Sequence, residues 1–109
     1  MLRILVLFLS LNLLSDVNKF IDASSKKYDQ LALDLWDYAE MGYQEVKSSN
    51  ALKKVLKEEG FSIRSNIAGI PTAFIAEYNN GGPVIAILAE YDALPGLSQN
   101  NVPYRESVG

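Results

Sequence analysis

The 109-residue sequence contains neither cysteine nor histidine. The absence of cysteine excludes a disulfide scaffold and thiol catalysis, and it leaves the redox compartment open. The absence of histidine excludes Ser–His catalysis and every zinc site with an imidazole ligand, so carboxylates are the only metal ligands available. Basic runs are also missing, and the net charge of −3 argues against non-specific nucleic-acid binding.

Long hydrophobic runs are missing as well. The longest apolar stretch, Ile4 to Leu14, follows Arg3 and falls short of the roughly 20 residues that span a bilayer, so no stable membrane span is expected. It matches the apolar region of a secretory signal peptide, and we expect residues 1–15 to be one, with cleavage near Ser15. An uncleaved anchor and a buried N-terminal helix are the alternatives. Export, to a periplasm or to the exterior, follows from a signal peptide; otherwise the protein is cytoplasmic.

Two helices are predicted before residue 60. Apolar residues recur at steps of three and four through residues 16–41 and again through residues 45–59. Gly42 and Gly60 are expected to end these helices. The positions predicted to be buried are Tyr28, Leu31, Leu35, Trp36 and Tyr38 in the first helix, and Ala51, Leu52, Val55 and Leu56 in the second.

Strands follow the helices, which indicates an α/β fold. Strands are predicted at Phe61–Ile63, Thr72–Tyr78 and Val84–Ala89, with a turn at Asn79–Pro83. Val84–Ala89 is apolar at every position, which is typical of a central strand covered on both faces. The chain lacks the neighbours that such a strand needs, so we expect residues 16–109 to be the N-terminal part of a larger catalytic domain.

Glu90 and Asp92 form the one candidate site. They follow the apolar strand, and ligands of open α/β sheets bind beyond the carboxyl ends of strands. Two residues apart on an extended chain, they point to the same side, where they could hold a metal, orient a metal-bound imidazole, or act as acid and base. A solvated loop and a helix cap are the alternatives. Ser98 lacks both a second glycine and an activating histidine, so it does not form a nucleophile elbow.

Three stretches, Trp36–Glu45, Gly69–Phe74 and Glu90–Gln99, together resemble the start of the metal-dependent amidohydrolases. The third reads Glu-Tyr-Asp-Ala-Leu-Pro-Gly-Leu-Ser-Gln and is similar to the aminobenzoyl-glutamate hydrolase branch. The wider group, which includes N-acyl-amino-acid and auxin-conjugate amidohydrolases, usually keeps only the Asp-Ala-Leu-Pro part. Within the first stretch, Tyr43–Glu45 matches a helix-start motif with a structural role.

The resemblance implies an α/β catalytic domain like that of zinc metallopeptidases, with a smaller lid domain that often dimerises. It also implies two divalent ions, zinc or manganese, and a glutamate general base. The family's first metal ligands lie in a Gly-His-Gly-Cys-His-type motif after the Asp-Ala-Leu-Pro loop, beyond Gly109. No catalytic residue or metal ligand is therefore assigned in this chain. Asp92 is expected to orient a metal ligand by a hydrogen bond, and Glu90 occupies the place of a metal-binding histidine in related metallopeptidases.

On this resemblance the chain is expected to be the N-terminal part of an exported metallo-amidohydrolase. Its partner would be a small-molecule amide, either p-aminobenzoyl-glutamate or another N-acyl amino acid. A non-catalytic short product, serving as an interaction module or left from a decayed gene, is the alternative. Neither metal binding nor hydrolysis is expected of the 109 residues alone.

Overall fold

The computed structural model describes the backbone of residues 2–109 and the side chains of residues 16–109. The chain divides into two compact units, and the boundary between them in the sequence falls between Gln30 and Leu31. The expected signal peptide, residues 1–15, lies outside the residues whose side chains are described.

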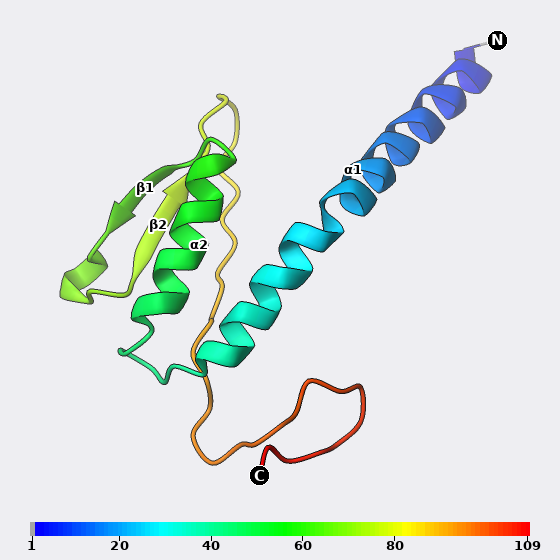
Figure 1. Ribbon diagram of the computed structural model, residues 1–109. Helices are drawn as coiled ribbons and strands as arrows, with labels where there is room; N and C mark the ends of the chain where they lie inside the picture. The colour runs from blue at the N-terminus through cyan, green and yellow to red at the C-terminus, as the bar shows by residue number, and fades with distance from the viewer. Residues whose placement is uncertain (1) are drawn as a thin grey trace. The chain divides into compact units, whose positions relative to one another are not determined.

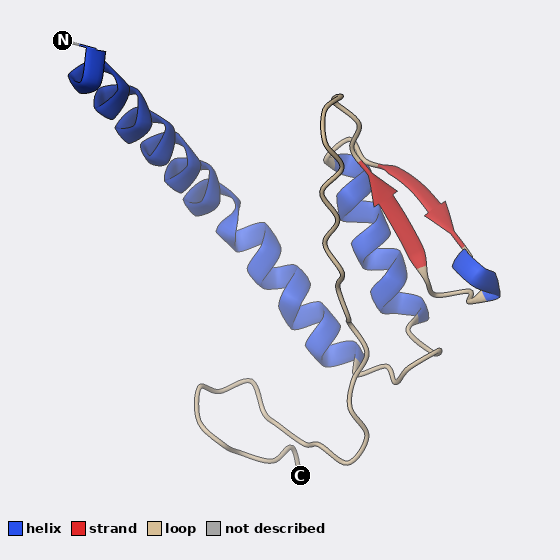
Figure 2. Ribbon diagram, turned by 180° about the vertical axis from the view of Figure 1, so that it is seen from behind, coloured by secondary structure: helices blue, strands red, loops and turns tan. Residues whose placement is uncertain are grey.

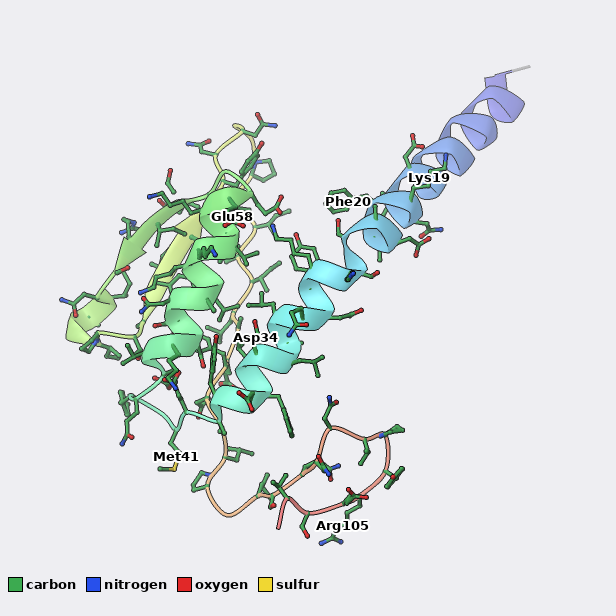
Figure 3. The ribbon with its side chains drawn as sticks, in the orientation of Figure 1. Lys19, Phe20, Asp34, Met41, Glu58 and Arg105 are labelled. Carbon is green, nitrogen blue, oxygen red and sulfur yellow. The ribbon has the colours of Figure 1, made fainter. Side chains whose placement is uncertain are left out.

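Helix α1, Leu2–Tyr38, forms the first unit as far as Gln30, and its last turns, from Leu31, belong to the second unit. The helix predicted from residue 16 is confirmed as far as Tyr38. Over residues 16–30, the helical spacing places Val17, Phe20 and Ile21, each more than half exposed, on one face. Figure 3 labels Phe20 on this helix. Within the described residues, no helix combines the length and the hydrophobicity required to cross a membrane.

Helix α1 ends earlier than the sequence predicted, and a different residue ends it. Ala39 takes the left-handed conformation with φ +45°, and its N–H donates to the oxygen of Leu35 at 3.3 Å. The expected terminator, Gly42, has no positive φ and lies in the turn beyond. The prediction for Gly42 was therefore wrong, because an alanine tolerates the strained conformation that glycine usually occupies.

Helix α2, Val46–Glu58, ends as the sequence predicted. Gly60 takes φ +91°, its N–H donates to the oxygen of Lys57, and the N–H of Phe61 donates to the oxygen of Leu56. These two bonds form a Schellman motif, in which a residue with positive φ satisfies the last carbonyls of the helix.

Figure 1 shows α2 lying against a two-stranded antiparallel sheet. Strand β1, Ser62–Ser65, pairs with β2, Phe74–Glu77, in the register that places Ser62 opposite Glu77. A short 3-10 helix, η1 (Ile67–Gly69), lies in the connection between them. The strands predicted around residues 61–63 and 72–78 are thereby confirmed. The mixture of helix and strand is compatible with part of an α/β domain.

The third predicted strand does not form. Residues 84–89 form no ladder with β2, and Figure 2 draws them as loop. Val84, Ile85, Ile87 and Leu88 are 85–95% exposed, so the prediction of a central strand covered on both faces is wrong for this structure. The segment has the residues of a buried strand, but no neighbouring strand is present to supply its hydrogen bonds.

Among the side chains of residues 16–109, no hydrophobic residue is fully buried. The predicted inner face of α2, Ala51, Leu52, Val55 and Leu56, is only half-buried. Tyr38 is half-buried too, while Trp36 is 42% exposed, so the prediction that both are core residues was wrong. A single hairpin covers one side of α2 and leaves these faces partly open to water.

Gly60→Ala should destabilise the second unit by about 1 kcal/mol, because a side chain at φ +91° is strained. The added Cβ would lie 3.5 Å from Cε2 of Tyr78, an ordinary contact, so the cost comes from the backbone. Urea unfolding followed by circular dichroism measures the loss. Lys54→Ala, on the exposed face of the same helix, is the control, and an equal effect of both substitutions would contradict the assignment of the cap.

Ile87→Lys should reduce self-association, because an exposed apolar segment with unpaired backbone groups is a template for strand pairing between copies. Light scattering across a concentration series measures the associated fraction. Asn79→Lys adds the same charge outside the segment and should leave that fraction nearly unchanged. If both variants lower association equally, net charge rather than the segment controls it.

Candidate functional site

Among residues 16–109, the most deeply buried side chains lie around the start of α2, and all of them are polar. Those less than a tenth exposed are Glu45 at 8%, Ser48 at 1%, Ser49 at 2% and Thr72 at 5%. Buried polar groups are stable only when they are hydrogen-bonded. The hydrogen bonds among these residues therefore determine the geometry of this region.

The carboxylate of Glu40, just beyond α1, accepts three hydrogen bonds from the first turn of α2. Its Oε1 accepts the N–H of Lys47 at 3.0 Å. Its Oε2 accepts the N–H of Ser48 at 2.8 Å and the hydroxyl of Ser48 at 2.9 Å. The Lys47 ammonium also lies over the ring of Tyr38, 5.6 Å from its centre. The end of α1 and the start of α2 are joined through these contacts.

Glu40 acts as the cap of α2. The first N–H groups of a helix have no partner within it, and the side chain of the N-cap residue usually accepts one of them. The N-cap residue here is Glu45, whose side chain makes no such bond. Glu40 supplies the acceptor oxygens instead, and its negative charge is favourable at the positive end of the helix dipole.

The Glu45 carboxylate points back into the turn. Its Oε1 accepts the N–H of Tyr43 at 2.9 Å, and its peptide oxygen accepts the N–H of Ser49, also at 2.9 Å. Tyr43 has φ +67°, a conformation that few residues other than glycine adopt. The hydrogen bond that Glu45 accepts from Tyr43 stabilises this strained turn. The second oxygen, Oε2, is buried and makes no hydrogen bond.

Both carboxyl groups favour the ionised form. Burial by itself raises the pKa of Glu40, but the hydrogen bonds from Ser48 and Lys47 outweigh it and lower the pKa below its ordinary value of 4.5. Burial likewise raises the pKa of Glu45, while its own N–H, the Thr72 side chain and the Tyr43 N–H bring the pKa below 4.5. Burial and the negative charge of Glu45 raise the pKa of Tyr91.

The predicted acidic loop, residues 90–95, is anchored at two points, one in this turn and one at Thr72, just before β2. The N–H of Ala93 donates to the peptide oxygen of Glu40 at 2.7 Å, within a parallel bridge between Met41 and Ala93. The hydroxyl of Tyr91 donates to the peptide oxygen of Thr72 at 2.5 Å. Figure 3 shows Met41 at the turn between the helices.

Asp92 lies between these two anchors and is exposed. A Cβ added to Gly42 would lie 3.7 Å from Oδ2 of Asp92 and 3.9 Å from Oε1 of Glu45, so both carboxylates approach the same glycine. Glu90 is exposed as well. The structure thus places Asp92 and Glu45 on the same side of Gly42, which the sequence analysis did not predict.

Glu40 and Ser48 were missed entirely as residues that organise the site. Trp36–Glu40 was interpreted as helix, and Tyr43–Glu45 only as a helix-start motif. The available signal is the pair Ser48–Ser49, two small hydroxyl residues in the first turn of a helix otherwise rich in charge, with an acid a few residues before them.

The loop after Pro95 is closed by its own polar groups. The hydroxyl of Ser98 donates to the peptide oxygen of Val108 at 3.1 Å and accepts its N–H at 2.9 Å, so Ser98 has a structural role.

The same loop also contacts the end of α1, where the indole N–H of Trp36 donates to the peptide oxygen of Gln99 at 3.0 Å. An open hollow of about 780 Å³ borders the loop, and Arg105, on the outer part of the loop in Figure 3, contributes to its lining.

The described side chains do not fit a metal centre. Residues 16–109 contain no group of three or more acidic side chains close enough to hold an ion. Glu40 and Glu45 are committed to peptide N–H groups, which leaves Asp92 and Glu90 as the exposed acids of the site. We therefore derive no chemical step through a metal held by these residues.

Acidification should unfold the region around α2. Folding lowers the pKa of the Glu40 and Glu45 carboxyl groups, so each stabilises the folded state fully at a pH above 4.5, its pKa in the unfolded chain. This stabilisation is lost as the pH falls through the lower pKa of the folded state. We expect the urea midpoint to be flat from about pH 7 to about pH 5.5 and to fall below about pH 4.5. In Glu40→Gln this fall should be smaller, whereas in Glu90→Gln it should persist. Identical pH profiles for Glu40→Gln and the unmodified chain would contradict the role of Glu40.

No family model matches the chain. It is 41% identical over 90 residues to a subunit of the p-aminobenzoyl-glutamate hydrolase of Escherichia coli, covering 79% of this chain and 19% of that protein. It is 38% identical over 77 residues to N-acetylcysteine deacetylase of Bacillus subtilis, covering 69% of this chain and 20% of that protein. It is also 35% identical over 72 residues to N-acetyl-L-cysteine deacetylase of Bacillus subtilis, covering 64% and 17%.

The chain spans about a fifth of the length of these curated relatives. The resemblance predicted from the three sequence stretches is confirmed by these matches. The homologues of this chain include a p-aminobenzoyl-glutamate hydrolase and other amidohydrolases and deacetylases, which match part of its length.

Proposed function

We propose that the chain supplies the N-terminal part of the catalytic domain of a metal-dependent amidohydrolase. Its substrate would be p-aminobenzoyl-glutamate or a similar N-acyl amino acid. The observation that carries the proposal is the similarity to three hydrolases whose names describe the same chemistry, removal of an acyl group from an amino acid nitrogen. The chain's small share of each relative's length supports the view that further residues complete the site.

In this proposal the described residues form a support for the site and hold no metal themselves. The turn at Glu40–Glu45 fixes the acidic loop, and Asp92 orients a metal ligand through a hydrogen bond, as carboxylates beside metal centres commonly do. Two divalent ions, zinc or manganese, would polarise the amide and activate water, with ligands and general base from residues beyond this chain. Glu90, exposed at the start of the same loop, is the second candidate for an orienting role.

Two further parts of the proposal rest on the sequence alone. The apolar run after Arg3 supports export of the protein to a periplasm or to the exterior, with residues 1–15 as the signal peptide. The resemblance to enzymes with a dimerising lid domain supports a dimeric assembly.

The proposal is tested on the gene product purified from its native source. An intact mass several times 12.1 kDa, with release of glutamate from p-aminobenzoyl-glutamate that a chelator abolishes, would support it. Asp92→Asn should then lower activity or metal affinity by about 10- to 100-fold. Asp37→Asn, an exposed acid of α1, should leave both unchanged.

An intact mass near 12.1 kDa without turnover would overturn the enzymatic proposal and favour a non-catalytic short product. Turnover that persists in a metal-free preparation would overturn the metal-dependent mechanism. N-acetylcysteine, offered as a second substrate, separates the two kinds of relative: preferential hydrolysis of it would replace p-aminobenzoyl-glutamate as the substrate.

A further inference from the structure

Glu40 contacts two parts of the second unit with two different groups. Its carboxylate accepts three hydrogen bonds from Lys47 and Ser48 in α2. Its peptide oxygen accepts the N–H of Ala93 from the acidic loop at 2.7 Å. One residue therefore joins the start of a helix to the loop that holds Asp92.

The side-chain contacts restrict where the peptide oxygen lies. Ser48, which donates to the carboxylate with both its N–H and its hydroxyl, is only 1% exposed and is fixed within α2. On the other side, Ala39 holds φ +45° directly before Glu40. With both its side chain and its preceding backbone constrained, the oxygen of Glu40 presents a fixed acceptor to Ala93.

Asp92 lies between two anchored neighbours. Tyr91 is held by the bond from its hydroxyl to the peptide oxygen of Thr72, and Ala93 by the bond to Glu40. The Thr72 bond alone would leave the loop free to rotate about Tyr91. The Glu40 bond supplies the second point, which places Oδ2 of Asp92 beside Gly42, on the same side as Oε1 of Glu45.

We infer that Glu40 is the positioning residue for Asp92: its carboxylate is tied to α2, and its peptide oxygen sets the place of the loop at Ala93. The chemical importance of Asp92 rests on the proposed function, whereas the positioning itself does not. The two are therefore tested by separate measurements.

The first measurement is the hydrogen-exchange rate of the Ala93 amide, followed by NMR in the full chain. Glu40→Ala removes the three bonds to α2 and should speed exchange at Ala93 by about fivefold, a factor typical of losing one net hydrogen bond. Glu40→Gln keeps an acceptor oxygen and should restore part of the protection. If Glu40→Ala does not fold, the comparison of Glu40→Gln with the unmodified chain serves instead.

Gly60→Ala is the matched control, because it weakens α2 at its opposite end, away from the loop. It should speed exchange in the last turn of α2, and once each rate is corrected for the loss of stability measured by urea unfolding, it should leave Ala93 unchanged. Unaltered exchange at Ala93 in both Glu40 variants, or equal acceleration in Gly60→Ala, would overturn the inference and leave Glu40 only as a helix cap.

The second measurement uses the active protein from the native source. Glu40→Gln should lower kcat with little change in KM, because it displaces a group that acts on the reaction and not on substrate binding. Normal kcat combined with faster exchange at Ala93 would refute the proposed role of Asp92 while the positioning stands. Unchanged exchange would refute the positioning whatever the kinetics.

Discussion

The hydrogen bonds between the Glu40 carboxylate and the first turn of α2 are the constraint on which the second unit depends. The N–H groups in the first turn of a helix have no acceptor within that helix. In α2, the N–H groups of Lys47 and Ser48 find their acceptor in Glu40, a residue outside the helix. The same residue carries the oxygen to which Ala93 is bound. Helix start, turn and acidic loop are therefore ordered by one side chain and one peptide group.

This arrangement reverses the usual distribution of burial. In most domains the apolar faces are buried and the polar groups lie at the surface. Here the buried residues among those described are serine, threonine and glutamate, while Val84 and its apolar neighbours are exposed to water. Hydrogen bonds thus define the local geometry here, while the hydrophobic surfaces of the helix and hairpin remain partly exposed. A layer packed over these surfaces would add stability without redefining the turn.

The sequence predicted those features that short-range physics decides. The end of α2 at Gly60 follows from a glycine with positive φ, and the antiparallel pair follows from the alternation around Ile63 and Phe74. The end of α1 was misplaced because Ala39, which has a Cβ, takes the conformation for which Gly42 was the better candidate. The strand at Val84–Ala89 failed because its pairing depends on distant segments, which composition does not reveal.

The sequence predicted Asp92 of the candidate site but not Glu40, again because only short-range patterns can be read along a chain. Asp92 could be named because it follows an apolar run, a pattern visible along the chain. The role of Glu40 could not, because a cap is ordinarily sought at the residue next to the helix, and this acceptor lies several positions before it. Nor does any local pattern show that the oxygen of Glu40 meets Ala93, more than fifty residues later.

The bond from Trp36 to Gln99 gives the molecule an internal optical probe. Trp36 is the only tryptophan of the sequence, and its indole N–H donates to a peptide oxygen of the loop after Pro95. Indole emission shifts with the polarity and hydrogen bonding around the ring, so the fluorescence of the 109-residue chain reports whether that loop is docked on the end of α1. Detachment of the loop would thus be visible in a spectrum without any label.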